Sequence, residues 1–320
     1  MSGTKGIQAR IKSVKNTKKV TKAMEMVAAA KMRRAIDAVL KTRTYASLSW
    51  EIVLRLSQAV NNEHPLLTKI ITTGKQKKDV PSSKIAVILF TSNRGLCGGF
   101  NSNIINELYK TIKNTVKSEN VDLILVGKKG VTAHNHYKYN IEAEFVKPDI
   151  ASGVDDVVPI VKLVIKDYLA GKYSKIIIAY TDYINATKQM PRVKQLLPVN
   201  VNKEDEYLGT VDVGENNASS HSVIEEKPKK KLNDSNEYIF EPSPHEVLDE
   251  MVPRLIEVQI FQALLESNAS EHSARMTAMH QATDAASDMI DELTLTYNKV
   301  RQAGITAEIA EIGAGVNAMN

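Results

Sequence analysis

The stretch LDEMVPRLIEVQIFQALLESNASEHSARMTAMHQATDAASDMIDEL, residues 248–293, decides the fold of this 320-residue chain. Steps of three and four residues from Leu248 reach eighteen positions, of which fourteen are apolar. A seven-residue apolar repeat of that length predicts the seam of a coiled coil. At about 1.5 Å per residue, a helix over 244–312 would be about 100 Å long, more than a compact domain can contain. The seam positions are Leu248, Met251, Leu255, Val258, Gln262, Leu265, Ala269, His272, Met276, Met279, Thr283, Ala286, Ile290, Leu293, Tyr297, Val300, Gly304 and Ala307.

Three residues mark the start of this helix. Ser243 can cap it, Pro244 suits the first helical position, and Glu246 can complete a capping box. Pro253 should bend the helix near its base. We therefore predict a C-terminal coiled-coil helix within residues 243–320, preceded by a short return strand over 237–242.

The N-terminal arm is the best partner for this helix. The same stepping from Ala28 finds seven apolar residues among nine positions, and Ile7, Ile11 and Val14 extend the stripe toward the N-terminus. We predict one helix over 3 to about 59, within an N-terminal segment 1–60, ended by the sequence NNEHP. Because both helices join the middle of the chain at the same end, they should pair antiparallel. The longer C-terminal helix should then project alone.

Short β-rich apolar runs alternate with helical stretches in the middle of the chain. This alternation predicts a Rossmann-like α/β domain with a mostly parallel sheet. The domain would span 82–201, after a linker over 61–81 and before a flexible polar excursion over 202–236. It would thus be an insertion between the two long helices. The predicted strands lie in 84–92, 121–127, 141–146, 174–183 and 192–201, and the predicted helices in 101–118, 128–138 and 155–171.

Positive charge is concentrated on the N-terminal arm. Residues 1–44 hold twelve Lys or Arg against Glu25 and Asp37, a net charge of +10, whereas the whole chain carries +5. Such an arm either faces an acidic partner (nucleic acid, anionic lipid or acidic protein) or is the solvated face of a helix. The single cysteine excludes an internal disulfide, and no apolar stretch reaches the roughly 18 residues of a membrane span.

The sequence RGLCGGFN, residues 94–101, forms a glycine turn between a predicted strand and a predicted helix, as many nucleotide sites do. Its spacing is G-x-x-G-G instead of G-x-G-x-x-G, and the second strand ends in Gly127, Lys128 and Lys129 without a carboxylate for the ribose. We expect a structural corner, with the following helix capped by Asn101 or Ser102.

Other chemistry has little support in the sequence. Cys97 has no histidine within thirty residues to serve as its base. His134 and His136 could pair at a metal, but they lack a third ligand nearby, and they more simply end a surface helix. We expect no catalytic residue, no cofactor and no metal.

Three motifs occur in order: KVTKAMEMVAAAKMRRA at 19–35, RGLCGGFN at 94–101, and SARMTAMHQATDAASDMI with YNKVRQAGITAEIAEI over 273–312. Together they closely resemble the gamma subunit of the F-type ATP synthase, over nearly the whole chain. The resemblance implies a central rotor shaft made of the two terminal helices, with the α/β domain at its foot. It also implies a subunit that is not catalytic itself, whose rotation takes three catalytic beta subunits in turn through open, loose and tight states.

The resemblance also implies partners and a location. One copy per complex would contact three alpha and three beta subunits, the epsilon subunit and the c-ring of the membrane sector, and no nucleic acid. Because the chain starts Met-Ser-Gly with no evident presequence, we expect a bacterial peripheral membrane protein on the cytoplasmic face of the inner membrane. The paired cysteines of the chloroplast form are missing, so thiol regulation by that route is not expected.

Motif match carries two groups of contact residues onto this chain. Phe240 stands where a tyrosine is common in the family, so it cannot supply the hydroxyl of that tyrosine. Expected contacts between rotor and stator are Met24, Arg275, Arg301, Gln302 and Thr306, and expected contacts of the foot with the membrane ring and epsilon are Tyr238, Phe240 and Glu241.

Two other functions stay open from the residues alone. A basic coiled-coil protein could bind nucleic acid through the arm, although the arm has mostly Lys and no aromatic residue before Tyr45. A nucleotide-dependent enzyme could be built on the α/β domain.

Overall fold

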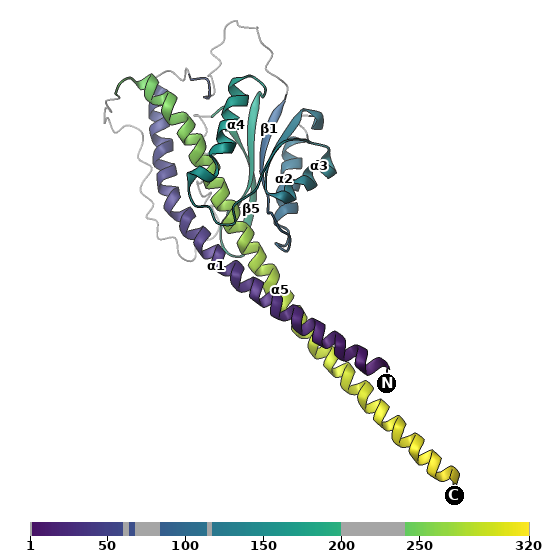
Figure 1. Ribbon diagram of the computed structural model, residues 1–320. Coiled ribbons are helices and arrows are strands. Elements are labelled where there is room, and N and C mark those ends of the chain that lie inside the picture. The colour runs from purple at the N-terminus through teal and green to yellow at the C-terminus, as the bar shows by residue number, and fades with distance from the viewer. Residues whose placement is uncertain (1, 60–63, 68–83, 114–116, 200–240, 320) are drawn as a thin grey trace, which may run out of the picture.

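Two long helices run side by side, and a compact α/β unit sits at one end of them (Figure 1). The computed structural model describes residues 2–59, 64–67, 84–113, 117–199 and 241–319. Helix α1 spans Ser2–Ala59 and helix α5 spans Pro244–Met319. The C-terminal end of α1 lies beside the start of α5, so the pair is antiparallel, and α5 continues well beyond the N-terminus (Figure 1). We call the α/β unit, residues 84–199, the head, and the part of α5 beyond Tyr297 the tip.

The predicted seam of α5 is buried where α1 accompanies it. Seam residues between Leu248 and Ala286 are buried or half-buried, and Ile290, Leu293 and Tyr297 are half-buried. The Thr283 hydroxyl donates to the Thr21 hydroxyl of α1 over 2.8 Å. On the tip, in contrast, large apolar side chains are exposed, for instance Ile309 at 64% and Ile312 at 68%. The seam is therefore buried only along the length that α1 covers.

The ends of the helices follow local signals. The backbone N–H of Glu246 donates to the Ser243 hydroxyl over 3.3 Å, as the predicted cap requires, and α5 begins at Pro244. The helix continues past Pro253. On α1 the buried stripe includes Ala28, Val39, Val53 and Leu56. Both long helices thus lie where the apolar periodicity predicts them.

The head contains one five-stranded sheet in the order β3-β2-β1-β4-β5. Every neighbouring pair is parallel except β4 and β5, which are antiparallel. This exception has a simple cause, because the short connection between these two strands permits a hairpin but not a crossover. The sheet confirms the mostly parallel α/β fold. The strands are β1 Ile85–Phe90, β2 Val121–Val126, β3 Asn140–Phe145, β4 Lys175–Tyr183 and β5 Gln189–Leu197.

Strand position in the sheet explains the burial patterns. The central strands β1 and β2 are buried at every residue, as strands covered on both faces are. The edge strand β3 is mostly exposed or half-buried. One face of the sheet packs on Ile104 and Leu108 of a short helix, and the other face packs on Val161, Val164 and residues of α5.

The short helices of the head differ from the prediction at their ends. The helix expected over 101–118 ends at Ile112, and a 3-10 turn, Ser118–Asn120, precedes β2. The helix expected over 155–171 begins at Val158, one residue before a proline that suits a helix N-terminus. The helices are α2 Phe100–Ile112, α3 Val131–Tyr137 and α4 Val158–Leu169, and further 3-10 turns are Lys128–Gly130 and Val154–Asp156.

Several predictions fall on residues that the structure does not describe. The polar excursion over 202–236 lies outside the described residues, and so does most of the linker over 61–81. The return strand over 237–242 can be checked only at its end, where Glu241 and Pro242 form a bend and no strand. The domain boundaries as such stay a prediction. Within the described residues, no helix has the length and apolar character of a membrane span.

Candidate functional site

Helix α5 changes its surroundings as it passes the head. Residues 258–273 are buried on every side, because α1 covers one face of the helix and the sheet covers the other. The same helix is therefore one strand of the coiled coil and one layer of the head. Beyond this segment, α1 and α5 leave the head together through a narrow neck (Figure 1).

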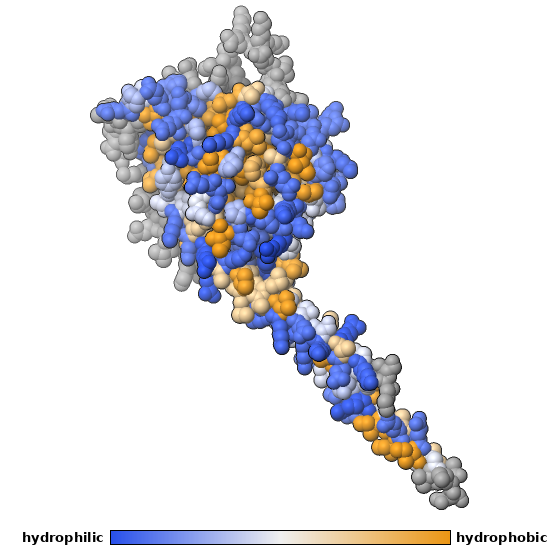
Figure 2. Space-filling view, viewed as in Figure 1, coloured by the Kyte–Doolittle hydropathy of each residue, from blue (hydrophilic) through white to orange (hydrophobic). Residues whose placement is uncertain are grey.

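A groove of about 460 Å³ lies at the neck, where α1, α5, the glycine turn and the segment after β3 meet. Its wall on α1 is apolar except for Lys31, and Val20 and Val27 there are 58% and 56% exposed. Figure 2 shows apolar atoms gathered at this neck, below the more polar head. We call it the neck groove; its lining residues are Val20, Ala23, Met24, Val27, Ala28, Lys31, Arg94, Gly95, Leu96, Asp149, Glu271, His272 and Arg275.

The glycine turn contributes one wall of the neck groove. Leu96 adopts a left-handed conformation with φ of 64° and exposes 62% of its surface there. Gly98, with φ of 56°, lets the chain turn back toward α2 without steric cost. An apolar side chain in a left-handed conformation is unusual, and here it adds to the apolar lining of the neck groove.

Cys97 is packed inside the turn as a small buried residue. It is 2% exposed, and the Asn101 amide donates to its sulfur over 3.3 Å. The Asn101 side chain also accepts from the Ser92 backbone N–H at 2.9 Å and donates to the Ser92 hydroxyl at 2.8 Å. Asn101 therefore ties the helix to the strand. The prediction that Asn101 or Ser102 caps α2 is wrong, because Gly99 is the N-cap and has no side chain to accept from the first N–H groups of the helix.

The place where doubly wound sheets bind ligands is covered by α5. Such ligands lie outside the carboxyl ends of strands, where the strand order reverses, here between β1 and β4. After β1, the carbonyls of Arg94 and Gly95 accept from the Arg275 guanidinium at 3.3 and 3.4 Å. At the end of β4, the Thr181 carbonyl accepts from the Ser270 hydroxyl at 3.1 Å. A helix of the same chain thus takes the position of a ligand.

Gly127 closes the adjacent end of β2. Its φ is 108°, and a Cβ there would lie 2.2 Å from the Thr91 carbonyl oxygen. The Thr91 hydroxyl donates to the Gly127 carbonyl over 2.9 Å. This contact holds the ends of β1 and β2 together where a dinucleotide fold would admit the cofactor.

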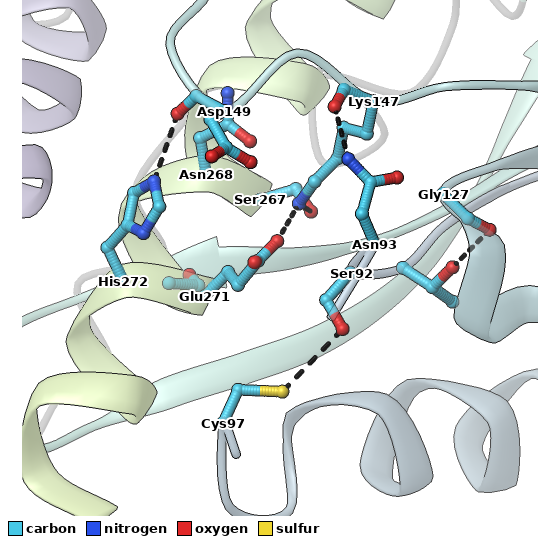
Figure 3. A network of polar contacts seen from close by, with 12 residues as sticks. Ser92, Asn93, Cys97, Gly127, Lys147, Asp149, Ser267, Asn268, Glu271 and His272 are labelled. Carbon is cyan, nitrogen blue, oxygen red and sulfur yellow. Dashed lines mark hydrogen bonds and ion pairs between the residues drawn. The ribbon is translucent and has the colours of Figure 1, made fainter. Parts of the chain in front are cut away.

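A buried ionic network joins α5 to the head. The Lys147 ammonium, 2% exposed, forms an ion pair with Glu271, 5% exposed, and donates to the Ser267 hydroxyl at 3.4 Å. The second oxygen of Glu271 pairs with Arg275 at 2.8 Å. Burial acts to raise the pKa of Glu271, but Lys147 and Arg275 outweigh it and hold that pKa below its usual value. Glu271 is therefore a buried carboxylate with two cationic partners, of which Figure 3 shows Lys147.

The network continues from α5 to α1. His272 Nε2 lies 3.0 Å from the Asp149 carbonyl, and its Nδ1 lies 3.4 Å from the Arg275 guanidinium. A carbonyl can only accept and a guanidinium can only donate, so the ring carries its proton on Nε2 and is neutral. The Asp149 carboxylate accepts from the Lys31 ammonium of α1 at 2.6 Å, and this bond lowers the pKa of Asp149. Head, α1 and α5 are thus connected.

Glu266 is a second buried carboxylate on α5, with a side chain that is 1% exposed. Glu266 is paired with Arg43 of α1 at 2.9 Å and accepts from the Gln262 amide at 2.9 Å. Its other oxygen accepts from the backbone N–H of Tyr183 at 3.2 Å. Burial raises the pKa of Glu266 although Arg43 opposes the shift. This group also links α1, α5 and the sheet.

The structure brings together some of the residues expected from motifs and separates others. Met24 and Arg275 both line the neck groove. Arg301, Gln302 and Thr306 are exposed on the tip, where the Thr306 hydroxyl donates to the Gln302 carbonyl at 3.0 Å. Glu241 is exposed just before α5, and Tyr238 and Phe240 lie outside the described residues. The expected stator contacts therefore form two separate regions, the neck groove and the tip.

Sequence reasoning missed most of the polar residues at the neck. The two ion pairs there join residues from three distant parts of the chain, and no local sequence pattern predicts these contacts. The pairs are Lys31–Asp149 and Lys147–Glu271. Leu96 had a signal, because it is a large apolar residue within a polar glycine turn. His272 lies on the predicted seam, and in the structure its ring is hydrogen-bonded to the Asp149 carbonyl.

The basic arm has two kinds of cation. Lys5, Arg10, Lys12, Lys15 and Lys19 are exposed along the first turns of α1. Lys31 and Arg43, farther along, form the ion pairs with Asp149 and Glu266. The first part of the arm is therefore a cationic surface, and the second part holds the fold together.

Comparisons with known proteins agree with this architecture. A family model described as ATP synthase matches residues 3–319. The chain is 35% identical to a protein named ATP synthase gamma chain from Legionella pneumophila (strain Corby), with 100% of both chains covered. It is 39% identical to the protein of the same name from Heliobacterium modesticaldum, again with 100% of both covered.

Solved structures with the same fold come from large assemblies. One is a chain of the Euglena gracilis mitochondrial ATP synthase, described as OSCP/F1/c-ring in rotational state 3, with a TM-score of 0.61, 18% identity, and 99% of this chain and 95% of that chain covered. Another is from the Tetrahymena thermophila mitochondrial ATP synthase, described as central stalk/c-ring, with a TM-score of 0.55, 21% identity, and 82% and 99% covered. At these identities the likeness concerns the fold.

Proposed function

The chain belongs to the gamma chain family of ATP synthase, and on that premise we propose that it is the central rotor shaft of the complex. In this proposal it is not catalytic itself. It couples rotation of a membrane ring to sequential conformational changes of three beta subunits, which carry out the catalysis.

The projecting tip of α5 is the observation that supports the proposal most strongly. A single helix with exposed Ile305, Ile309 and Ile312 extends beyond the end of α1, away from the head. Exposed apolar side chains on a lone helix require a surrounding surface, and a ring of partner subunits around the tip would supply one. The off-centre coiled coil below it would press on different subunits as it turned.

Two regions would meet the stator. At the tip, Arg301, Gln302 and Thr306 present polar groups beside exposed apolar ones, which suits shallow contact with a sleeve. At the neck, Met24 and Arg275 lie in an open groove beside the exposed cations of α1, which suits loops that are both acidic and apolar. Differential contact with the beta subunits, rather than strong binding, would shift their states.

Shallow contact is a physical requirement for a rotor. Each ~1.4 kcal/mol of extra binding to one subunit would slow release from it about tenfold. The neck groove is lined by small or flexible side chains, including Ala23, Met24 and Ala28, and by long cationic ones. Such a surface can meet three identical partners in turn without a deep specific pocket for any of them.

The opposite end of the shaft would face the membrane. Glu241 lies directly before the start of α5, at the end of the molecule farthest from the tip. Motif match assigns the contacts with the c-ring and the epsilon subunit to Tyr238, Phe240 and Glu241, and of these residues Glu241 is the one that the structure describes. The subunit would be a peripheral membrane protein on the cytoplasmic face of the bacterial inner membrane.

Co-purification tests this proposal. The tagged chain is isolated from detergent-solubilised membranes, and native mass spectrometry measures the composition of the complex. We expect one copy with three alpha and three beta subunits, together with epsilon and the c-ring, and no nucleic acid. Recovery of the tagged chain without alpha and beta subunits, or with bound nucleic acid that persists at moderate salt, would count against the proposal.

A further inference from the structure

The part of α5 that is buried in the head is polar, so apolar packing does not explain how the head holds this helix in place. The run ESNASEH, residues 266–272, is buried, although it has a single alanine and no larger apolar residue. Burial by itself has no preferred direction. If burial alone held this face of small and polar side chains, the helix could slide or turn against the sheet with little loss of buried area. A shaft that transmits torque must not slip there.

Directional hydrogen bonds fix this face instead. Four side chains of α5 reach backbone carbonyls of the head: Asn268 to Pro148 at 3.1 Å, Ser270 to Thr181 at 3.1 Å, His272 to Asp149 at 3.0 Å, and Ser273 to Ala186 at 2.7 Å. Each bond is made in one register of the helix and broken in the next. Figure 3 shows Asn268 and His272 on the side of α5 that faces the segment of Lys147 and Asp149.

The Lys147–Glu271 pair is the charged member of this set. The Lys147 ammonium lies 5.4 Å from the centre of the Phe100 ring, and the Lys147 carbonyl accepts from the Asn93 amide at 2.6 Å. Lys147 is thereby held by the segment after β1 on one side and bonded to α5 on the other. A buried ion pair contributes little net stability compared with apolar residues of the same size, and its best attested use is to select one register.

We propose that Lys147 and Glu271 are positioning residues that lock α5 against rotation and sliding in the head, so that torque passes between the foot and the tip. This inference rests on the proposed rotor function. Asn268 and His272 support the lock through their bonds to the segment after Lys147. The role of the pair is to hold α5 in place, although the Glu271 side chain also lines the neck groove.

Lys147→Met is the sharpest test, because it breaks the link without leaving a bare charge. Glu271 keeps Arg275 as its partner, and the methionine fills most of the space of the lysine stem. Lys172→Met is the matched control, since Lys172 pairs with Glu142 and Asp167 within the head and has no part in the bonds to α5. Complexes with each variant are reconstituted into vesicles, and ATP hydrolysis, ATP-driven proton pumping and the Tm of the soluble sector are measured.

We expect Lys147→Met to lower the Tm, because the buried Glu271 keeps only Arg275 as a cationic partner, and to keep its rate of hydrolysis. The pumping per ATP hydrolysed should fall by about threefold or more, which exceeds what the lower Tm accounts for. Lys172→Met should keep the wild-type ratio. Asn268→Leu is a second, independent variant, because it removes one directional bond and also a buried amide oxygen that has no hydrogen-bond partner among the described residues. The loss of the unpaired oxygen offsets part of the cost of leaving the Pro148 carbonyl without its donor, so the variant should fold and also lose pumping.

Each result is decisive. If both variants pump as well per ATP as the wild type, or lose pumping only in proportion to a lower Tm, the lock is refuted and the rotor function stands. If the wild-type chain itself gives vesicles that hydrolyse ATP without pumping protons, the rotor function is refuted, and this inference with it.

Discussion

Met24 lies at the point where the arm and the glycine turn form the neck groove. Lys31, Arg94 and Arg275 line the same groove, so a lysine in place of Met24 would add a fourth cation to it. We expect Met24→Lys to impair the coupling between ATP hydrolysis and proton movement, because the added charge changes how the groove meets the stator. The measurement is the ratio of protons pumped to ATP hydrolysed in vesicles.

Met26 offers a matched control for this substitution. It is 60% exposed on α1 and does not line the neck groove. Met26→Lys should therefore keep the wild-type ratio. An unchanged ratio in Met24→Lys would show that the groove has no part in coupling.

His272 makes the stability of the neck dependent on pH. Burial lowers the pKa of this ring, which faces Glu271, Arg275, Lys147 and Asp149, and both of its nitrogens are engaged in the neutral form. The folded chain therefore favours the neutral ring more than the unfolded chain does. The free energy of unfolding should be largest above the usual pKa of 6.5 and should decrease as the pH falls below it, toward the lowered pKa of the folded state.

A substitution isolates this contribution. His272→Gln can donate to the Asp149 carbonyl and accept from Arg275 without titrating. Melting temperatures between about pH 8 and pH 5 should fall less for His272→Gln than for the wild type, while Glu271 with its lowered pKa stays ionised in both. Parallel profiles would mean that His272 does not titrate differently on folding. His64, whose pKa burial also lowers, is present in both chains and cancels.

At the residue scale, family motifs in the sequence single out two residues that line the neck groove, whereas the buried ion pairs have no such signal. Met24 and Arg275 are found by their motifs, and the structure brings them to one groove. Lys147 and Glu271 are 124 positions apart, and only the folded sheet brings them together. The residue types did not indicate burial, because Lys and Glu are usually solvent-exposed. A single sequence does not show which of them are buried as a pair.

At the element scale, the coiled coil owes its stability to the buried seam. Leu56 of α1 is 0% exposed, and Leu48 on the same helix is 55% exposed. We expect Leu56→Ala to lower the free energy of unfolding by about 2–5 kcal/mol, because it removes a buried side chain and leaves a cavity. Leu48→Ala should change it by about 0.5 kcal/mol or less. Urea unfolding of the purified chain, followed by circular dichroism, measures both, and equal losses would contradict this assignment of the seam.

Periodicity predicted the elements well and their ends less well. The seam of α5 and the runs of β1, β2 and β4 were clear, because long periodic or continuous apolar patterns have few other interpretations. The end of α2 at Ile112 was not clear, since the polar residues that follow it are as compatible with helix as with a turn. The antiparallel direction of β5 follows from the length of its connection, a signal present in the sequence but not used.

At the scale of the whole molecule, the shape follows from two helices of unequal length that are joined to one head. The sequence predicted this shape, because the two seams and the inserted β-rich runs leave few other arrangements. It did not predict that α5 is also a layer of the head. Residues 258–273 are buried on all sides, yet their serines, asparagine and glutamates resemble the solvated face of an amphipathic helix. The polar bonds that join shaft and head are therefore visible in the structure alone.

The central claim is that this molecule turns as one body inside a ring of catalytic subunits. A probe on the head can report that motion, because the Lys110 side chain is 73% exposed on α2 and the native Cys97 is buried. In complexes fixed to a surface through their beta subunits, a particle attached at Lys110→Cys should rotate in one direction when ATP is added, with three pauses in each turn. A particle that stays still, or only fluctuates, while the same complexes hydrolyse ATP would contradict the account.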